Sequence, residues 1–316
     1  MHTPLLHLPD VTLVGVDNRT PKLALQAMQH CRAQVRFART LLFTDAATAA
    51  GPLPDGVQAL PVQIDSVSAY SHFMLRGLLP HIHTSHLLVV QWDGYLLDAA
   101  QWSPEFLACD YIGALFRDEP EGRNVGNGGF SLRSRRLLQA LQDPRITPTH
   151  PEDACIAQQH RPLLEQAHGI RFAPPALAAR FAYERVAPNG PTFGFHGLFN
   201  LPRVMDTLAL NDFIDALPDA LFKGVDARDL CKALMRIGRL AEARQVLARR
   251  LAAGQRDGRT RQLQARLALR QLGQRLGLLA ASDQPASKAA TSHCSVSPSM
   301  LTTSKRQGGS AGRRIR

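Results

Sequence analysis

The sequence predicts an α/β protein with a mostly parallel sheet covered by helices on both faces, followed by a small helical extension. Two observations predict this fold class. Short apolar runs of strand length alternate with helix-length stretches over the first half of the chain, which is the pattern of a parallel sheet. From about residue 227 the apolar residues recur with the 3.6-residue period of amphipathic helices.

Four strands are expected in the first hundred residues, and each is a compact apolar or β-branched run. They cover residues 11–16, 40–44, 57–64 and 86–91. Pro21 suits the first turn of a helix after the first strand. A second helix is expected over residues 68–79, with Ser66 or Ser68 as its cap.

Three aspartates lie just beyond the ends of predicted strands: Asp17, Asp45 and Asp93. In open α/β sheets, ligands bind beyond the carboxyl ends of the strands. We therefore expect the functional site at this edge of the sheet.

The pattern changes after residue 110. A charged and glycine-rich stretch over residues 118–129 predicts a loop that enters a tight turn. A short strand or turn over 130–133 follows, and Ser134 is suited to cap a helix that ends near Leu141. Pro151 and the two acids after it predict the start of a helix that runs to about His168.

The end of the chain is predicted to be helical and then disordered. Residues 230–254 resemble one tetratricopeptide-like (TPR-like) helical hairpin, and the chain beyond residue 281 is rich in Ser, Thr, Gly and basic residues without periodicity. The predicted organisation is a domain over 1–210, a helical extension over 211–280 and a disordered basic tail over 281–316.

The composition limits the class of protein. The chain has 316 residues, of which 45% are hydrophobic, as in globular proteins. No apolar run approaches the ~18 residues that span a membrane, and the segment 1–4 lacks the features of a signal peptide. The five cysteines are widely separated and form no CxxC motif, which favours a reducing compartment. We therefore expect a cytoplasmic protein.

The formal net charge of +11 is distributed unevenly. Residues 227–316 carry 19 Lys and Arg against 4 Asp and Glu, whereas residues 1–226 carry 18 against 22. Three roles of the basic segment stay open: contact with a protein partner, contact with an anionic membrane surface, which would place the chain peripherally at the inner membrane, or none beyond a solvated appendage. Nucleic acid is not the expected partner, because the segment has no recognised motif and no interleaved aromatic residues.

Three segments carry residues suited to chemistry. Asp93, after a buried strand and before a glycine, has the position of a carboxylate that reaches a divalent metal and a diphosphate. Gly128 and Gly129 belong to a glycine cluster that allows positive φ and close approach of a ligand. His196 lies between an aromatic residue and a glycine, as a metal ligand or phosphate donor could. Each feature also has a structural explanation: a turn cap, a flexible hairpin and a core histidine.

Five short segments, taken in order, resemble an uncharacterised bacterial glycosyltransferase-like family that is labelled only as a domain of unknown function. That family looks like the GT-A nucleotide-sugar transferases, so the resemblance implies a GT-A-like, Rossmann-type mixed sheet flanked by helices. It covers about residues 10–200 and rests on the order and spacing of the segments. They are residues 14–19, 91–94, 126–133, 151–153 and 193–197.

The resemblance implies a hexosyltransferase-like enzyme with a nucleotide-diphosphate sugar as donor and a glycan, a lipid-linked molecule or a protein as acceptor. A divalent cation, Mn²⁺ or Mg²⁺, would be held by Asp93 and His196. In the catalytic role the resemblance places Asp153 or Glu152, with Asp153 as the base of an inverting displacement; retention stays open. The donor-binding residues that it implies are Asp17, Asn18, Arg19, Gln91, Trp92, Asp93, Gly128, Gly129 and Arg133.

One departure from the GT-A pattern keeps a second function open. In those enzymes a strand-end Asp-x-Asp binds the cation, but here Gln91 stands where the first aspartate would be. The alternative is therefore a catalytically degenerate GT-A-like protein that binds sugar nucleotides or acts as an interaction protein, with the helical hairpin as its partner surface.

Overall fold

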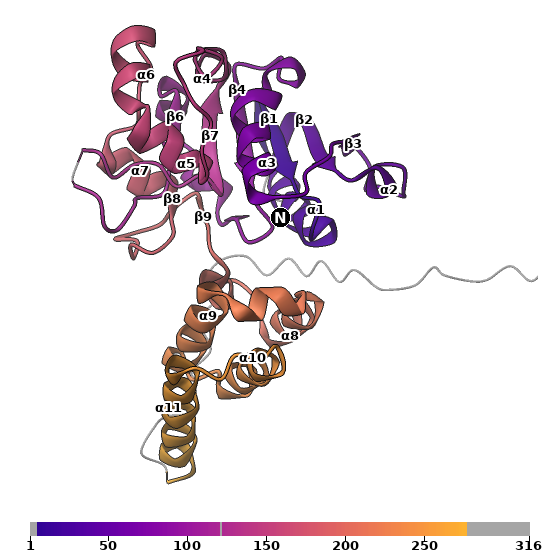
Figure 1. Ribbon diagram of the computed structural model, residues 1–316, viewed down its shortest axis with the longest axis vertical. Helices are drawn as coiled ribbons and strands as arrows, with labels where there is room; N and C mark the ends of the chain where they lie inside the picture. Colours follow the sequence, from indigo (N-terminus) through magenta and orange to yellow (C-terminus); the bar gives the residue numbers. More distant parts are fainter. Residues whose placement is uncertain (1–4, 121, 277–316) are drawn as a thin grey trace, which may run out of the picture. The chain divides into compact units, whose positions relative to one another are not determined.

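The computed structural model describes residues 5–120 and 122–276 (Figure 1). The described residues fall within one compact unit over residues 1–282. The predicted disordered tail over 281–316 lies outside the described residues. None of the helices in the described ranges has the length and apolar character that a bilayer crossing needs.

The main sheet has six strands in the order β3-β2-β1-β4-β7-β6. The first four are parallel, β7 runs antiparallel to β4, and β6 runs antiparallel to β7. The predicted α/β class with a mixed, mostly parallel sheet is confirmed. The strands are β1 (Leu6–Val16), β2 (Val35–Thr44), β3 (Gln58–Pro61), β4 (His86–Val90), β6 (Tyr111–Gly113) and β7 (Phe130–Ser134).

Helices cover both faces of this sheet, and the strands explain why. Successive side chains of a strand point to opposite faces, so Leu13 and Val14 belong to two different buried clusters. The Leu13 cluster includes buried residues of α1 (Pro21–Arg32) and α7 (Pro175–Phe181). The Val14 cluster includes those of α4 (Arg135–Ala140) and α6 (Arg161–His168).

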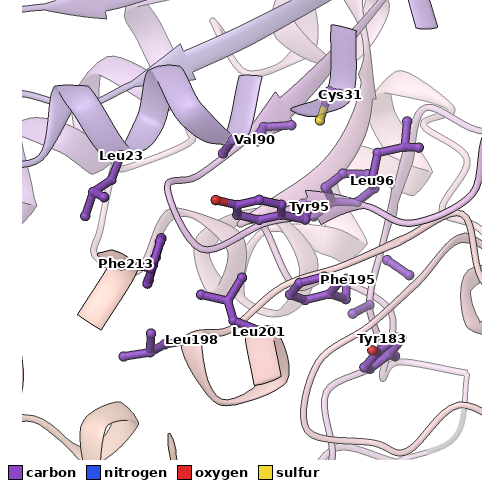
Figure 2. Close-up of a cluster of buried hydrophobic side chains, with 14 of the residues drawn as sticks. Leu23, Cys31, Val90, Tyr95, Leu96, Tyr183, Phe195, Leu198, Leu201 and Phe213 are labelled. Atoms are coloured by element: carbon purple, nitrogen blue, oxygen red, sulfur yellow. The ribbon is translucent and has the colours of Figure 1, made fainter. Parts of the chain in front are cut away.

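A second, three-stranded sheet has the order β5-β9-β8. Its strands, β5 (Tyr95–Leu96), β8 (Ala182–Tyr183) and β9 (Gly194–Phe195), have only two residues each. Figure 2 shows the aromatic packing that accompanies it. The Phe195 ring stacks between Tyr95 and Tyr183, with ring centroids 5.9 and 5.8 Å apart. This sheet joins the loop after β4 to the segment that carries His196.

Local sequence signals account for most helix starts. Pro21 opens α1, and the Ser66 hydroxyl accepts a hydrogen bond from the Ala69 N–H at the start of α3 (Val67–His72). The Ser134 hydroxyl does the same for Leu137 in α4. The short α2 (Ala46–Ala49) follows Asp45, whose side chain caps it.

The prediction of one continuous helix from residue 151 to 168 is wrong. The segment forms α5 (Glu152–Ala154) and a π-helical turn (Cys155–Gln159), and it then breaks at His160 before α6. Pro162 lies in the first turn of α6. Proline has no N–H to continue a helix and is tolerated in a first turn, so the helix restarts there.

The C-terminal part of the described chain is helical. Its helices are α8 (Thr207–Ala216), α9 (Val225–Arg236), α10 (Leu240–Ala252) and α11 (Gly258–Arg275). Helices α9 and α10 correspond to the predicted hairpin, and Gly238, between them, has a φ of +77°. Leu230 and Leu247 belong to the same buried cluster as Leu13 of the sheet. The likeness to a tetratricopeptide unit and the boundary at residue 210 stay predictions.

Candidate active site

Asp93 lies in the turn that follows β4 at the carboxyl edge of the sheet. The Gly94 N–H donates to the Gln91 carbonyl and closes the turn, and the Gln91 N–H donates to the Gly129 carbonyl, which ties the turn to β7. One carboxylate oxygen of Asp93, Oδ2, accepts a hydrogen bond from the Leu198 N–H at 3.1 Å. The other, Oδ1, lies 3.2 Å from His196 Nε2. The position predicted for a strand-end carboxylate is therefore occupied by a buried and fixed side chain.

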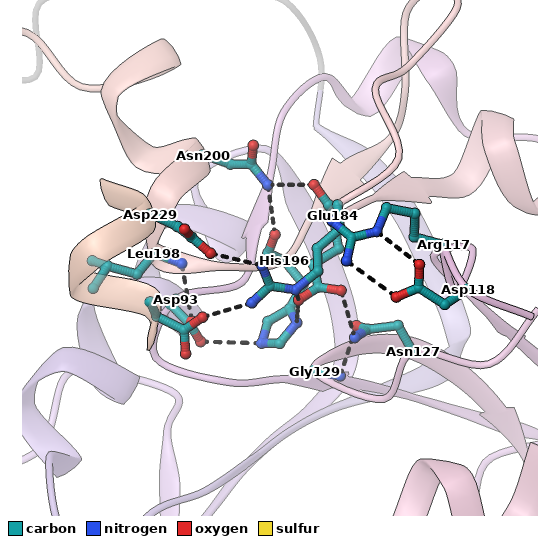
Figure 3. Close-up of polar contacts among 12 residues, drawn as sticks. Asp93, Arg117, Asp118, Asn127, Gly129, Glu184, His196, Leu198, Asn200 and Asp229 are labelled. Atoms are coloured by element: carbon teal, nitrogen blue, oxygen red, sulfur yellow. Dashed lines mark hydrogen bonds and ion pairs between the residues drawn. The ribbon is translucent and has the colours of Figure 1, made fainter. Parts of the chain in front are cut away.

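His196 is the centre of the site (Figure 3). Its Nε2 lies 3.2 Å from Gln91 Oε1 as well as from Asp93, and its Nδ1 lies 4.0 Å from Glu184 Oε1. The ring rests on Gly129, where a Cβ would come within 2.2 Å of Nε2. Burial alone would lower the pKa of His196, but Asp93 and then Glu184 outweigh it and raise the pKa to about 9. At neutral pH the ring is therefore an imidazolium.

Gln91 is oriented by a hydrogen bond from its Nε2 to the Tyr70 hydroxyl at 2.8 Å. That bond leaves Oε1 as the atom that faces His196. The residue that replaces the first aspartate of the GT-A pattern thus offers a neutral oxygen to the same centre as Asp93.

The glycine turn brings Asp153 to this edge of the sheet. The Gly128 N–H donates to Asp153 Oδ2 at 3.1 Å. A Cβ at Gly128 would lie 2.7 Å from Glu152 Oε1, so the backbone needs glycine for close approach. The expected positive φ is not found, because Gly126, Gly128 and Gly129 all have ordinary backbone angles. Burial raises the pKa of Asp153, and the neighbouring Glu152 raises it further.

Arg133 and Glu152 form an ion pair beneath the glycine turn. The guanidinium lies 3.1 Å from Glu152 Oε1, and the two side chains are 0% and 5% exposed. Arg133 also donates to the Ser131 hydroxyl at 3.0 Å and lies over the Tyr111 ring. The roles predicted for these two residues stay predictions, and in this conformation each has the other as its charged partner.

The segment predicted to hold the nucleoside lies at the end of β1. The Asp17 carboxylate accepts hydrogen bonds from the N–H groups of Arg19 and Thr20 and from the Thr20 hydroxyl, so it fixes the turn into α1. Asn18 donates to the Val62 carbonyl at 2.9 Å. Among the described residues, no hydrogen bond or ion pair joins this segment to Asp93 or His196.

Trp92 packs against the helical segment. Its ring stacks on Phe213 of α8, with centroids 6.1 Å apart and planes at 21°. Its predicted role in donor binding stays a prediction, and in this structure the ring joins the β4 turn to the helical segment.

Sequence reasoning missed the acidic and amide partners of His196. Glu184 accepts a hydrogen bond from Asn127 at 3.3 Å, and burial raises the pKa of its carboxyl group. Asn200 donates to the His196 carbonyl at 2.8 Å and to the Glu184 carbonyl at 3.0 Å. Arg185 pairs with Glu184 on one side and with Asp226 of α9 on the other. Asn127 lies within the glycine-rich segment 126–133, which the sequence singles out. No motif or spacing in the sequence marks Glu184 or Asn200 as functional.

The site fits a cation in part. Asp93 Oδ1 and His196 Nδ1 are buried and form no hydrogen bond among the described residues, although Asp93 Oδ1 forms an ion pair with His196 Nε2. Gln91 Oε1, Asp93 Oδ1 and the nearby imidazole are ligand types that divalent metals accept. No group of three or more His, Cys, Asp or Glu in the described ranges is arranged to hold a metal. At this site the described residues therefore offer a cation two ionisable ligands, Asp93 and His196, and one amide oxygen, that of Gln91.

Residues 57–196 match the model of a family described as "Protein of unknown function (DUF5672)". The matched range contains the β4 turn, the glycine turn and His196. No curated protein matches the chain.

Several solved structures are similar to the chain. A mannosyltransferase from Pyrobaculum calidifontis, in complex with GDP-Man and Mn²⁺, is 11% identical over 85% of this chain and 89% of its own, with a TM-score of 0.35. A glycosyltransferase involved in glycosylation of the major capsid of PBCV-1 is 10% identical over 66% and 99%, with a TM-score of 0.36. HddC from Yersinia pseudotuberculosis is 16% identical over 42% and 79%, with a TM-score of 0.28. Similarity this low says nothing of the substrate or metal of this chain.

Proposed function

We propose that the chain is a glycosyltransferase that moves a sugar from a nucleotide-diphosphate sugar to an acceptor hydroxyl. One observation carries the proposal. Asp93, Gln91 and His196 converge at the carboxyl edge of β4, and they lie against the glycine turn that also holds Asp153. A centre suited to a diphosphate and a separate carboxylate are the two parts that glycosyl transfer needs.

The first part deals with the charge of the leaving diphosphate. His196 is positively charged at neutral pH, and its charge is held in place by Asp93 and Glu184. A divalent cation would be held by Asp93 and His196, with Gln91 as a neutral oxygen ligand, and it would neutralise the phosphate oxygens. His196 must lose its proton to bind a metal, so the cation and the proton compete for this ring.

The second part is the base, and the structure favours Asp153 for it over Glu152. Glu152 is neutralised by Arg133, whereas Asp153 accepts hydrogen bonds from the N–H groups of Gly128 and Ala154. In an inverting displacement the acceptor hydroxyl gives its proton to the Asp153 carboxylate as its oxygen attacks the anomeric carbon. The bond from that carbon to the diphosphate breaks, and the electron pair leaves with the nucleoside diphosphate.

The nucleoside is proposed to lie at the end of β1. Because the oxygens of Asp17 are occupied by the turn into α1, the free groups there are Asn18 Oδ1 and the Arg19 side chain. Asn18 Oδ1 is buried without a hydrogen-bond partner among the described residues, which suits a donor from a ligand.

The test is a donor panel in which nucleotide release from UDP-, GDP- and TDP-sugars is measured with and without Mn²⁺. The wild-type chain is expected to turn over at least one donor. In Asp93→Asn, nucleotide affinity is expected to lose its dependence on Mn²⁺, because the charged ligand is gone, whereas the exposed Asp55→Asn control keeps it. Unchanged metal dependence in Asp93→Asn would show that the metal assignment is wrong. Binding without turnover of every donor would favour the degenerate, binding-only function.

A further inference from the structure

A pocket of about 380 Å³ lies beside the His196 centre, between the segment 183–203 and helix α9. Helix α9 contributes residues 229, 232, 233 and 236, which is the spacing of a single helix face, and Ile237 follows directly after the helix. The opposite wall includes Glu184 and Asn200, the two residues that contact His196 from this side. The pocket therefore shares a wall with the proposed active site.

Positive charge predominates in this pocket. Its lining includes Arg185, Arg203, Lys232 and Arg236 and the carboxylates Glu184 and Asp229. Both carboxylates already have cationic partners within the pocket. Asp229 pairs with Arg185 at 3.0 Å and with Lys232 at 2.9 Å, and Glu184 lies 3.5 Å from Arg185.

Two guanidinium groups remain without an acid. Arg203 lies over the Tyr183 ring, 5.6 Å from its centroid, and neither Arg203 nor Arg236 forms an ion pair with any residue in the described ranges. Guanidinium groups bind phosphate and carboxylate groups through paired N–H donors. The two guanidinium groups without an acidic partner therefore suit the pocket to an anionic ligand.

The position of the pocket separates it from the donor. The described residues that line it do not include Gln91, Asp93, Gly128 or Gly129, which are proposed to hold the donor. A ligand in the pocket would lie across Glu184 and Asn200 from His196. The pocket thus adjoins the His196 centre through Glu184 and Asn200 without sharing the residues proposed to hold the donor.

We propose that this pocket binds the acceptor through an anionic group, a phosphate or a carboxylate, held by Arg203 and Arg236. The inference rests on the proposed function, and it restricts the acceptor to a negatively charged glycan or a phosphate-bearing molecule. The same cations could instead hold the diphosphate of the donor, and the test separates the two sources.

The test is calorimetric titration of the full chain with glucose 1-phosphate, neutral glucose and UDP. Glucose 1-phosphate is expected to bind and glucose is not. In the double variant Arg203→Gln with Arg236→Gln, affinity for glucose 1-phosphate is expected to fall about tenfold or more, because two charge-assisted contacts are lost. Affinity for UDP is expected to stay within about twofold, because the residues proposed to hold the nucleotide do not line the pocket. The matched control is Arg244→Gln with Arg261→Gln, which removes the same charge from exposed positions outside the pocket.

An equal loss of UDP affinity in the pocket variant would assign the pocket to the donor diphosphate and overturn the proposal. Absence of glucose 1-phosphate binding to the wild type, or an equal loss in the control, would overturn it too. The single variants Arg203→Gln and Arg236→Gln give the same comparison if the double variant does not fold. The proposed function is tested separately, by nucleotide release from the wild type. If no nucleotide is released, the proposed function fails, but the titration with glucose 1-phosphate still tests whether the pocket binds an anion.

Discussion

His196 is surrounded by residues from distant parts of the chain. Asp93 and Gln91 come from the turn after β4, Gly129 from the glycine turn just before β7, and Glu184 from the loop after β8. The two carboxylates keep the imidazole charged, and the glycine lets the ring lie directly on the backbone. A charged group is thus fixed where a diphosphate is proposed to leave.

Replacing Gly129 by alanine tests this arrangement at the level of one methyl group. The new Cβ would overlap the His196 ring, so the ring must move, and we expect a loss of about 1–3 kcal/mol in stability together with weaker nucleotide binding. Gly190→Ala is the control, because a Cβ there meets nothing within 4 Å. Urea unfolding and nucleotide titration measure both effects. Equal behaviour of the two variants would contradict the placement of His196.

Individual site residues were predictable where a local motif marked them. Asp93 follows a strand, Gly129 lies in a glycine cluster and His196 follows an aromatic residue, and the structure brings all three together. Glu184 was not predictable, because its role depends on the fold placing it near His196 from twelve residues upstream. Burial of Arg133 was also hidden, since it depends on an ion pair with Glu152, nineteen residues away.

At the scale of elements, the turn after β4 is held from three sides. The Gln91 N–H donates to the Gly129 carbonyl just before β7, Asp93 accepts from the Leu198 N–H, and Trp92 stacks on Phe213 of α8. Helix α8 therefore supports the position of Asp93 although it provides no ligand itself.

Truncation of Phe213 tests this support. Phe213 is 1% exposed, so Phe213→Ala is expected to lower the free energy of unfolding by about 3–5 kcal/mol. Leu208 lies on the same helix but is 77% exposed, so Leu208→Ala is expected to change the free energy of unfolding by less than about 0.5 kcal/mol. Urea unfolding of both variants is the measurement. A similar small effect for both would show that α8 is not packed as described.

The elements themselves were largely predictable because their signals are local. Apolar runs predicted β1, β2 and β4, and the caps at Ser66 and Ser134 predicted two helix starts. The second sheet could not be predicted, because strands of two residues carry no periodicity. The break at His160 was missed because two acids after Pro151 gave a strong start signal for a longer helix.

At the scale of the molecule, the basic C-terminal segment of the sequence supplies positive charge to the pocket beside the proposed active site. Helix α9 of the basic segment turns Lys232 and Arg236 toward the pocket beside the active site. The same helix buries Leu230 and Leu234 in the cluster that contains the sheet residues. The helical segment therefore belongs to the core of the protein as well as to its proposed acceptor site.

This shared core predicts the behaviour of a fragment. The fragment 1–210 lacks the residues of α9 and α10 that pack in the cluster, so it is expected not to fold cooperatively. The fragment 1–282 keeps them and is expected to melt in a single transition. Thermal unfolding followed by circular dichroism compares the two. A cooperative transition of 1–210 at the same temperature would show that the predicted domain is independent.

The central claim is that this strand edge transfers a sugar with Asp153 as the base. The most direct measurement is nucleotide release by the wild type and Asp153→Asn, with nucleotide affinity measured in parallel and exposed Asp65→Asn as the control. We predict a loss of about 10²–10⁴-fold in turnover for Asp153→Asn with affinity retained. Because the pKa of Asp153 is raised and a base must be ionised, wild-type turnover should fall as the pH drops through that pKa. Wild-type turnover in Asp153→Asn would contradict the account.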